Sequence, residues 1–340
     1  MLLNLVSFPQ VGNLPVHIIR NDSASKVDIF IGEKLFTSYV YKSTIEKPIL
    51  YPINAANGMI ITRGFPLNPR PGERVDHPHQ LGMWFTFGDV NGLDFWNNSY
   101  AIPENEKNKY GRIIHKKISE ISINGSIGKL VVSLEWIDYL GKVLLNEETA
   151  FTFSGSENLR FIERNTKLSA KNNNVIFGDN KEGLMAVRVD RAFESPTKEP
   201  LIFTDANGKP TRVGAMDNTG KNGLYKSSSG YEGDSVWGTR NKWVCLTAKL
   251  NQSIITLAFF DHPDNPGFPA HAHARGYGLF ALNNFGHHVF NASEPGATFE
   301  LKSGNDIVFK YLFVVKSGSE MTTEEANEIS TFFGADIHKN

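Results

Sequence analysis

Short runs of alternating apolar and polar residues, each ended by turn residues, recur along almost the whole sequence. VDIFIG and KLFTSYVYK flank the turn at Gly32 and Glu33, and KLVVSLEWIDYL and KVLLNEETAFTF flank Gly141. Alternation with a period of two is typical of a strand with one buried face, and two such runs around a turn predict an antiparallel hairpin. Together with similar runs later in the chain, these hairpins predict about twelve to sixteen strands. The later runs are 159–168, 184–192, 242–249, 254–260 and 307–315.

Composition and one helical segment complete the expected fold. The chain has 24 Phe, 10 Tyr and 5 Trp beside 30 Gly and 16 Pro, a balance that favours strands and turns. Near the C-terminus, Thr322 and Glu325 predict a capping box, and Ala326, Ile329 and Phe333 share one helical face. No repeat or linker interrupts the pattern. The sequence therefore predicts an all-β fold, a large antiparallel β-sandwich with one short C-terminal helix, as a single domain over residues 1–340.

Charge and motif content exclude several classes of protein. The net charge is -1 without a basic stripe, which argues against a nucleic-acid partner. Apolar runs stop short of the roughly 20 residues that cross a bilayer. No secretory signal is evident at the N-terminus, so we expect a cytoplasmic location, or a periplasmic one if a signal peptide has been removed. The single cysteine, Cys245, excludes an intrachain disulfide and is predicted to be buried. Serine-hydrolase, P-loop and Rossmann motifs are absent.

Four segments concentrate His, Asp, Glu, Arg and Trp: 62–96, 177–189, 230–244 and 261–286. Two of them contain a pair of histidines two residues apart, which project to one side of the chain if it is strand-like. Such pairs can ligate Zn, Mn or Fe, with a nearby carboxylate completing the shell. The same histidines can instead bind a polar ligand without metal, or cap tight Pro-containing turns. The spacing permits a divalent metal without requiring one. The pairs are His77 with His79 and His271 with His273, and the nearby carboxylates are Asp76 and Asp261.

Other side chains of these segments suit a polar ligand. Asp179 and Glu182 can act in acid–base chemistry if their surroundings shift their pKa, although an ion pair of Glu182 with Arg188 is an equal alternative. A guanidinium fork matches a carboxylate or vicinal hydroxyls. Tryptophan rings with polar neighbours can stack on a sugar, although core packing is the commoner use. The arginines are Arg188, Arg240 and Arg275, and the tryptophans are Trp84, Trp96, Trp237 and Trp243.

Five ordered blocks between about residues 15 and 316 carry a family resemblance. They are TRGFP, DHPHQLGMWFTFGDVNGLDFW, FGDNKEGLMAVRV, SVWGTRNKWV and DHPDNPGFPAHAHARGYGLFALNNFG. The pattern resembles that of bacterial PmoA-like proteins, whose family carries the name "methane oxygenase PmoA". The methane-oxidising subunit of that name is an integral membrane protein, and this sequence has no span; we therefore expect no methane monooxygenase activity. The resemblance implies a fold like the galactose-mutarotase supersandwich. It also implies carbohydrate chemistry, because these proteins are associated with sugar-catabolic genes of Bacteroidetes and Planctomycetes.

These observations predict a carbohydrate-active enzyme that applies His and carboxylate acid–base chemistry to a sugar or sugar derivative, as an epimerase, lyase or hydrolase. A non-catalytic carbohydrate-binding or sensing module and a His-ligated metalloenzyme remain as alternatives. No cofactor is assigned, and His77, His79, His271 and His273 are the candidate ligands of a divalent metal. The predicted catalytic residues are His79, His273, Asp179, Glu182 and Asp261. The predicted substrate-binding residues are Arg63, Asp76, His77, Trp84, Arg188, Trp237, Arg240, His262, His271 and Arg275.

Overall fold

The computed structural model describes residues 14–198, 201–204, 209–213 and 218–335. Two large sheets dominate it, and their strands pair antiparallel throughout. The predicted all-β sandwich is thus confirmed. In spatial order, the nine-stranded sheet contains β1 (Val16–Asn21), β2 (Lys26–Ile31), β3 (Lys34–Val40), β4 (Ile49–Ile53), β5 (Met83–Phe85), β11 (Met185–Arg188), β19 (Leu279–Asn283), β18 (Ala270–Arg275) and β15 (Arg240–Asn241). The eight-stranded sheet contains β14 (Leu224–Ser227), β16 (Trp243–Leu250), β17 (Ser253–Asp261), β21 (Asp306–Ser317), β9 (Leu159–Ser169), β8 (Val143–Gly155), β7 (Ile127–Ile137) and β6 (Arg112–Asn124).

Smaller elements decorate the two sheets. Two further antiparallel pairs join β10 to β20 and β12 to β13. The paired strands are β10 (Val175–Phe177), β20 (Phe299–Leu301), β12 (Leu201–Thr204) and β13 (Pro210–Val213), and short 3₁₀ helices lie at Asp22–Ala24, Glu104–Lys109, Arg191–Phe193 and Gly233–Val236. Among the residues that the structure describes, no helix has the length and hydrophobicity that a membrane crossing requires.

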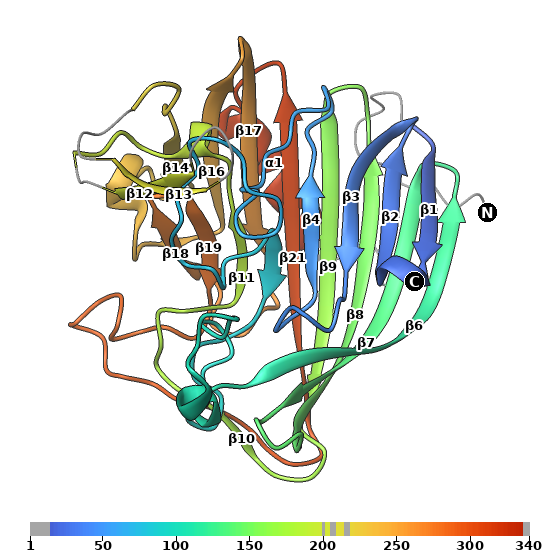
Figure 1. Ribbon diagram of the computed structural model, residues 1–340, viewed down its shortest axis with the longest axis vertical. Coiled ribbons are helices and arrows are strands. Elements are labelled where there is room, and N and C mark those ends of the chain that lie inside the picture. The colour runs from blue at the N-terminus through green and yellow to red at the C-terminus, as the bar shows by residue number, and fades with distance from the viewer. Residues whose placement is uncertain (1–13, 199–200, 205–208, 214–217, 336–340) are drawn as a thin grey trace.

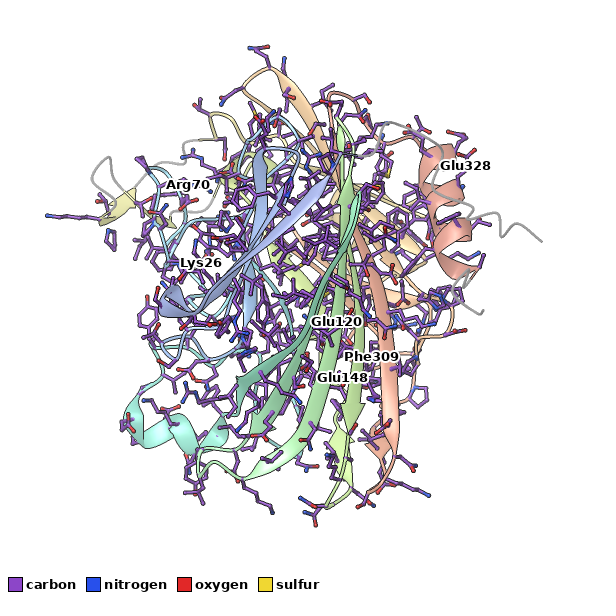
Figure 2. All side chains as sticks on the ribbon, turned by 90° about the vertical axis from the view of Figure 1, so that its right-hand side faces the viewer. Lys26, Arg70, Glu120, Glu148, Phe309 and Glu328 are labelled. Atoms are coloured by element: carbon purple, nitrogen blue, oxygen red, sulfur yellow. The ribbon has the colours of Figure 1, made fainter. Side chains whose placement is uncertain are left out.

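The main core lies between the two sheets, where strands β1 to β4 cross in front of strands β6 to β9 (Figure 1). Alternation along the strands builds it: in β17, Leu257 and Phe259 point into this core, while Ala258 and Phe260 point to the opposite face. Side chains fill the space between the sheets, including that of Phe309 (Figure 2). Burying each large apolar side chain contributes roughly 1.5–3 kcal/mol, so the period-two pattern drives the association of the sheets.

The predicted C-terminal helix is α1 (Thr323–Gly334), and it covers the outer face of the eight-stranded sheet (Figure 2). The capping box is present, since the backbone N–H of Glu325 donates to Thr322 Oγ1 at 3.1 Å and the N–H of Thr322 donates to the Glu325 carboxylate at 2.8 Å. Ala326 packs there in one cluster with Cys245. Burial raises the pKa of the Cys245 thiol to about 12, as suits the buried apolar residue that the sequence predicts.

Candidate functional site

Strands β5, β11 and β18, which are neighbours through β19 in the nine-stranded sheet, place five of the predicted site residues on its outer face: Trp84, Arg188, His271, His273 and Arg275. In β18, Ala270, Ala272 and Ala274 point into the main core, so the alternate residues His271, His273 and Arg275 point outward. Register then aligns residues from four strands: Trp84 of β5 pairs with Ala186 of β11, Ala186 with Ala281 of β19, and Ala281 with His273. The two alanines between Trp84 and His273 leave space above the sheet for side chains from loops.

The two histidine-containing loops meet on this face. His77 has a left-handed backbone, with a φ of 43°, and its ring stacks on Tyr277 with centroids 5.0 Å apart and planes within 4°. The rings of His77 and His79 lie 5.6 Å apart. Gln80 of the same loop accepts a hydrogen bond from Arg188, whose guanidinium lies 4.8 Å from the Tyr277 ring. Two segments that lie far apart in the sequence thus form one surface.

Asp76 holds this surface together through two buried arginines. Its Oδ1 accepts hydrogen bonds from Arg63 Nη1 at 2.6 Å and from Arg188 Nη2 at 2.8 Å. Burial by itself would raise the pKa of Asp76, but Arg188, His77 and Arg63 together hold it well below its usual range. Asp76 is therefore charged at neutral pH and serves as the anchor of the DHPHQ loop.

The two arginines that share Asp76 differ in their other contacts. Arg63 also donates to the backbone carbonyls of His77 at 3.0 Å and Gln80 at 3.2 Å, so its planar fork fixes the loop backbone. Arg188 is 0% exposed; its Nη1 donates to the side chain of Gln80, and its guanidinium lies 4.8 Å from the Tyr277 ring. Both arginines position other groups, and neither is open to solvent.

Beside His79 lies a buried cluster of two tryptophans and a lysine. Trp84 is 0% exposed, and its ring lies 5.2 Å from that of Trp96. Lys47 Nζ donates to the carbonyl of Trp96 at 2.9 Å and lies 5.9 Å from the Trp84 ring. Burial lowers the pKa of Lys47 to about 7. Burial, followed by the charge of Lys47, lowers the pKa of His79 to about 2, so His79 is a neutral imidazole.

His273 has a carboxylate as its neighbour. Its Nδ1 lies 3.8 Å from Glu182 Oε2, and its ring lies nearly parallel to that of Trp96, with centroids 6.4 Å apart. Burial, followed by the charges of Lys181 and Arg275, lowers the pKa of His273 to about 3. Glu182 also pairs with Lys181, not with Arg188 as the alternative interpretation of the sequence had it. The structure thus brings the two predicted acid–base residues His273 and Glu182 side by side.

His271 belongs to a second, neighbouring cluster. Its ring stacks on Phe290 at 4.9 Å, and its Nε2 lies 3.9 Å from Glu294 Oε1. Arg240 contacts Glu294 at 3.3 Å and His287 at 3.1 Å, and it donates to two backbone carbonyls of the 267–269 loop. Burial, followed by the charge of Arg240, lowers the pKa of His271 to about 4. Arg240 therefore fastens loops around the site.

Trp237, Tyr277 and Arg275 form the accessible rim of the site. The Arg275 guanidinium lies 5.6 Å from the Trp237 ring and 5.9 Å from the Tyr277 ring. Both rings are partly exposed and Arg275 is exposed. The Trp237 ring packs edge-on against Phe290, with centroids 5.5 Å apart, so the rim continues into the cluster around His271.

Three predicted site residues take positions that their backbone contacts explain. Asp179 accepts the N–H groups of His287 at 2.8 Å and His288 at 2.9 Å. Asp261 is buried and accepts from Asn265, Asn284 and the N–H of Ala270; burial raises its pKa to about 6 against these bonds. His262 accepts the N–H of Asp264 at 3.1 Å and packs against Phe333 of α1. These contacts hold loops together, so the three residues have structural positions.

A group of buried polar atoms on this face has no hydrogen-bond partner among the described residues. An unmade hydrogen bond of this kind costs about 1–3 kcal/mol when a group is buried without water or ligand, and native proteins contain few such groups. Their concentration sets this face apart from the rest of the described structure. The atoms are His79 Nε2, His271 Nδ1, His273 Nδ1, Arg188 Nε, and Nε1 of Trp84, Trp96 and Trp237.

The four candidate metal ligands do not form a coordination sphere. His77 stacks on Tyr277 and the charge of Lys47 acts on His79, whereas His271 and His273 both pack against Phe290. Within the described ranges, no group of three or more His, Cys, Asp or Glu side chains lies close enough together to hold a metal ion. The alternative of a His-ligated metalloenzyme therefore has no ligand set among the described residues.

Sequence reasoning assigned no role to several residues that complete the site. Tyr277 lies in the turn just after β18, inside the sequence block DHPDNPGFPAHAHARGYGLFALNNFG, which is the one signal that could have indicated it. Gln80 lies inside the DHPHQ block that the sequence singled out. Lys47 precedes a strand in a segment without any motif, and no sequence signal identifies it.

Comparisons with solved structures identify sugar-active proteins among those similar to this chain. A GH36 α-galactosidase, AgaB, from Geobacillus stearothermophilus is 12% identical, with a TM-score of 0.37 over 88% of this chain and 41% of that chain. A galactose mutarotase related enzyme from Lactobacillus acidophilus is 10% identical, with a TM-score of 0.30 over 90% and 99%. A GalM/aldose epimerase homologue from C. elegans is 10% identical, with a TM-score of 0.29 over 91% and 100%. The chain thus spans about two fifths of the α-galactosidase.

Identities and TM-scores of this size are too low to transfer an activity, a substrate or a residue role. No match was found among curated proteins. The model of one protein family, described as a family of unknown function (DUF6807), matches residues 26–331. This match gives no support for the PmoA-like resemblance. Because it covers most of the sequence, the protein belongs to the family of unknown function DUF6807.

Proposed function

We propose that this protein is an enzyme acting on a sugar or sugar derivative, and that the outer face of the nine-stranded sheet around His273 is its active site. The observation that carries the proposal is the 3.8 Å approach of the Glu182 carboxylate to the His273 imidazole, in the surface where buried polar atoms lack partners. A carboxylate and an imidazole beside a polar ligand are the usual groups for proton transfer.

The surroundings favour different roles for the two groups. His273 is 2% exposed and has a pKa lowered to about 3, so its imidazole is neutral and can donate an N–H hydrogen bond to a substrate oxygen, as neutral histidines do in other enzymes. Glu182 is then the general base that removes a proton from the substrate. Removal of a hydroxyl or C–H proton suits an epimerase or lyase, and activation of water suits a hydrolase.

Some aromatic residues of the site support other side chains, and others are exposed enough to contact a sugar. Trp84 is 0% exposed, so its ring face is not accessible for stacking, and we assign it a supporting role beneath His79. Trp237 and Tyr277 are partly exposed at the rim, and a partly exposed ring surrounded by polar groups suits stacking on the apolar face of a sugar. His77, stacked on Tyr277, extends this contact surface.

The test is a screen of sugars, glycosides and sugar acids by proton NMR, followed by two variants. Glu182→Gln and His273→Gln should each lower turnover by about a hundredfold or more, within the range that general acid–base groups contribute, and leave the circular dichroism spectrum unchanged. The matched controls are Glu148→Gln and His17→Gln, at exposed positions on β8 and β1. Wild-type turnover in both site variants would contradict the assignment.

A second candidate is a non-catalytic carbohydrate-binding module. It is favoured by the pKa values of His79 and His273, about 2 and 3, because imidazoles that stay neutral suit hydrogen bonding more than proton shuttling at neutral pH. In that case the screen detects binding without conversion of any sugar. Trp237→Ala should then abolish binding, while Glu182→Gln changes it little.

A further inference from the structure

Of the site arginines, Arg275 differs from the others in having no partner for its charge among the described residues. Arg63 and Arg188 share Asp76, and Arg240 pairs with Glu294. In the part of the chain that the structure describes, Arg275 makes no side-chain hydrogen bond or ion pair, and its contacts are with the rings of Trp237 and Tyr277. Asp234 approaches the backbone near Gly276, yet its carboxylate forms no ion pair with Arg275.

The two rings hold the guanidinium in place without neutralising it. Its carbon lies 5.6 Å from the centroid of Trp237 and 5.9 Å from that of Tyr277, distances at which cations interact with ring faces. Tyr277 is itself held by the stacked ring of His77 and by Arg188. Arg275 is therefore an exposed cation on a supported aromatic platform, which lowers the entropy lost when its fork engages a ligand.

A second unpartnered donor lies beside it. Trp237 Nε1 is buried and has no hydrogen-bond partner among the described residues, and an indole N–H can only donate. A ligand group that accepts hydrogen bonds satisfies both Trp237 and Arg275. An anion with two or more oxygens, such as a carboxylate or a phosphate, has this chemistry and matches the guanidinium fork.

The position of Arg275 relative to His273 indicates where on the ligand the anion lies. The two residues are alternate positions of β18 and point to the same face, which places their backbones about 7 Å apart. A pyranose ring fits this interval. An anionic substituent bound by Arg275 is then attached to the side of the ring away from the atoms next to Glu182 and His273.

We infer that the ligand of this site is an acidic sugar, whose anionic group binds Arg275 while its ring lies over the surface around His273. The inference rests on the proposed carbohydrate site and specifies the substrate class. A hexuronic acid, which carries a carboxylate, and a hexose phosphate are the two sources of such an anion. We favour the carboxylate, because Arg275 is a single free guanidinium and the neighbouring Lys181 already pairs with Glu182.

Isothermal titration calorimetry of the full chain tests the inference with named probes. D-glucuronate and D-galacturonate should bind about tenfold to a hundredfold more tightly than D-glucose and D-galactose, the range for a hydrogen-bonded charge. Arg275→Gln should remove that difference, so that this variant binds the acids and the neutral sugars with equal affinity. Arg275→Lys, which keeps the charge but loses the fork, should retain part of it. Arg20→Gln, at an exposed arginine on β1, is the matched control and should change nothing.

The outcomes separate this inference from the proposed function. If glucose and galactose bind as tightly as their acids, and Arg275→Gln alters neither, the acidic-sugar inference is wrong while the carbohydrate site stands. If no sugar of either class binds, both are wrong. D-glucose 6-phosphate distinguishes the two anions: tighter binding of it than of glucuronate, lost in Arg275→Gln, supports the inference and replaces the carboxylate by a phosphate.

Discussion

The ring of His77 stacks on the ring of Tyr277, with centroids 5.0 Å apart and planes within 4°. This contact joins the DHPHQ loop, which precedes β5, to the chain just after β18. It exists because β11 and β19 lie between β5 and β18 in the sheet, so segments far apart in the sequence reach one face. The surface proposed to bind a sugar depends on this long-range pairing.

The neutral histidines should make the fold sensitive to acid. His79, His271 and His273 have pKa values lowered to about 2, 4 and 3, chiefly by burial. The unfolded chain takes up these protons near pH 6.5 and the folded protein does not, so the free energy of unfolding falls as the pH decreases. Between about pH 6.5 and pH 5 each histidine should cost about 1.5 kcal/mol, measured by urea unfolding at several pH values.

Substitutions separate the contributions of individual buried groups to this pH dependence. Asp261 acts in the opposite direction, because burial raises its pKa to about 6. As the pH falls through 6, the folded protein takes up this proton before the unfolded chain does, and the resulting gain in the free energy of unfolding offsets part of the loss. Asp261→Asn should therefore make the decrease steeper, whereas His271→Gln should make it shallower. His17→Gln, at an exposed position, should leave it unchanged. If the free energy of unfolding depended on pH identically in Asp261→Asn, His271→Gln and His17→Gln, the buried groups would not control the acid sensitivity.

Asp76→Asn should destabilise the protein strongly. The substitution removes the one carboxylate that Arg63 and Arg188 share, and both guanidiniums are buried. Uncompensated buried charges of this kind cost about 3 kcal/mol or more, visible as a lower midpoint of urea unfolding. Asp22→Asn removes an exposed partner of Arg20 and should not move the midpoint. Equal midpoints for the two variants would contradict the anchoring role of Asp76.

Two tryptophans of the site should respond in opposite ways to alanine substitution. Trp84 is fully buried against Trp96, so Trp84→Ala should lower the free energy of unfolding by about 3–5 kcal/mol. Trp237 is partly exposed at the rim, so Trp237→Ala should lower stability much less and abolish binding of the sugars found in the screen. Thermal unfolding and calorimetry separate the two effects. Retained sugar binding in Trp237→Ala would remove this ring from the proposed site.

Cys245 should be inert in the folded protein. Burial raises its pKa to about 12 and α1 covers its surroundings, and the thiolate is the form that reacts. An aromatic disulfide reagent should modify it at neutral pH only after denaturation. Ala326→Asp, which places a charge in the contact between α1 and the sheet, should accelerate the reaction. Rapid modification of the native wild type would show that this face is open.

Much of the fold follows from local patterns in the sequence. The period-two alternation predicts the long strands, because an alternating strand buries only one face. The expected twelve to sixteen strands fall short of the 21 that the described residues form, since a short strand such as β15 or a strand buried on both faces such as β19 carries no alternation. The capping box of Thr322 and Glu325 predicts α1, since both of its hydrogen bonds form between residues three positions apart. The spacing of His271 and His273 predicts that they share a face. The single-domain organisation and the individual catalytic roles remain predictions.

Tertiary structure decided which polar residues share the site. Asp261, His262 and Asp179 are acidic residues or histidines like Glu182 and His273 and lie in the same sequence blocks. Hydrogen bonds with Asn265, with the N–H of Asp264 and with the N–H of His287, respectively, give them structural positions. Trp84 and Trp237 differ in exposure: Trp84 is fully buried, whereas Trp237 is partly exposed at the rim. Alternation determines which residues share a face, but the coverage of that face depends on loops that arrive through non-local strand pairing. For that reason the sequence by itself determined the long alternating strands, the helix and the paired histidines. Only the fold placed Glu182 beside His273 and left Arg275 at the rim without an ion-pair partner among the described residues.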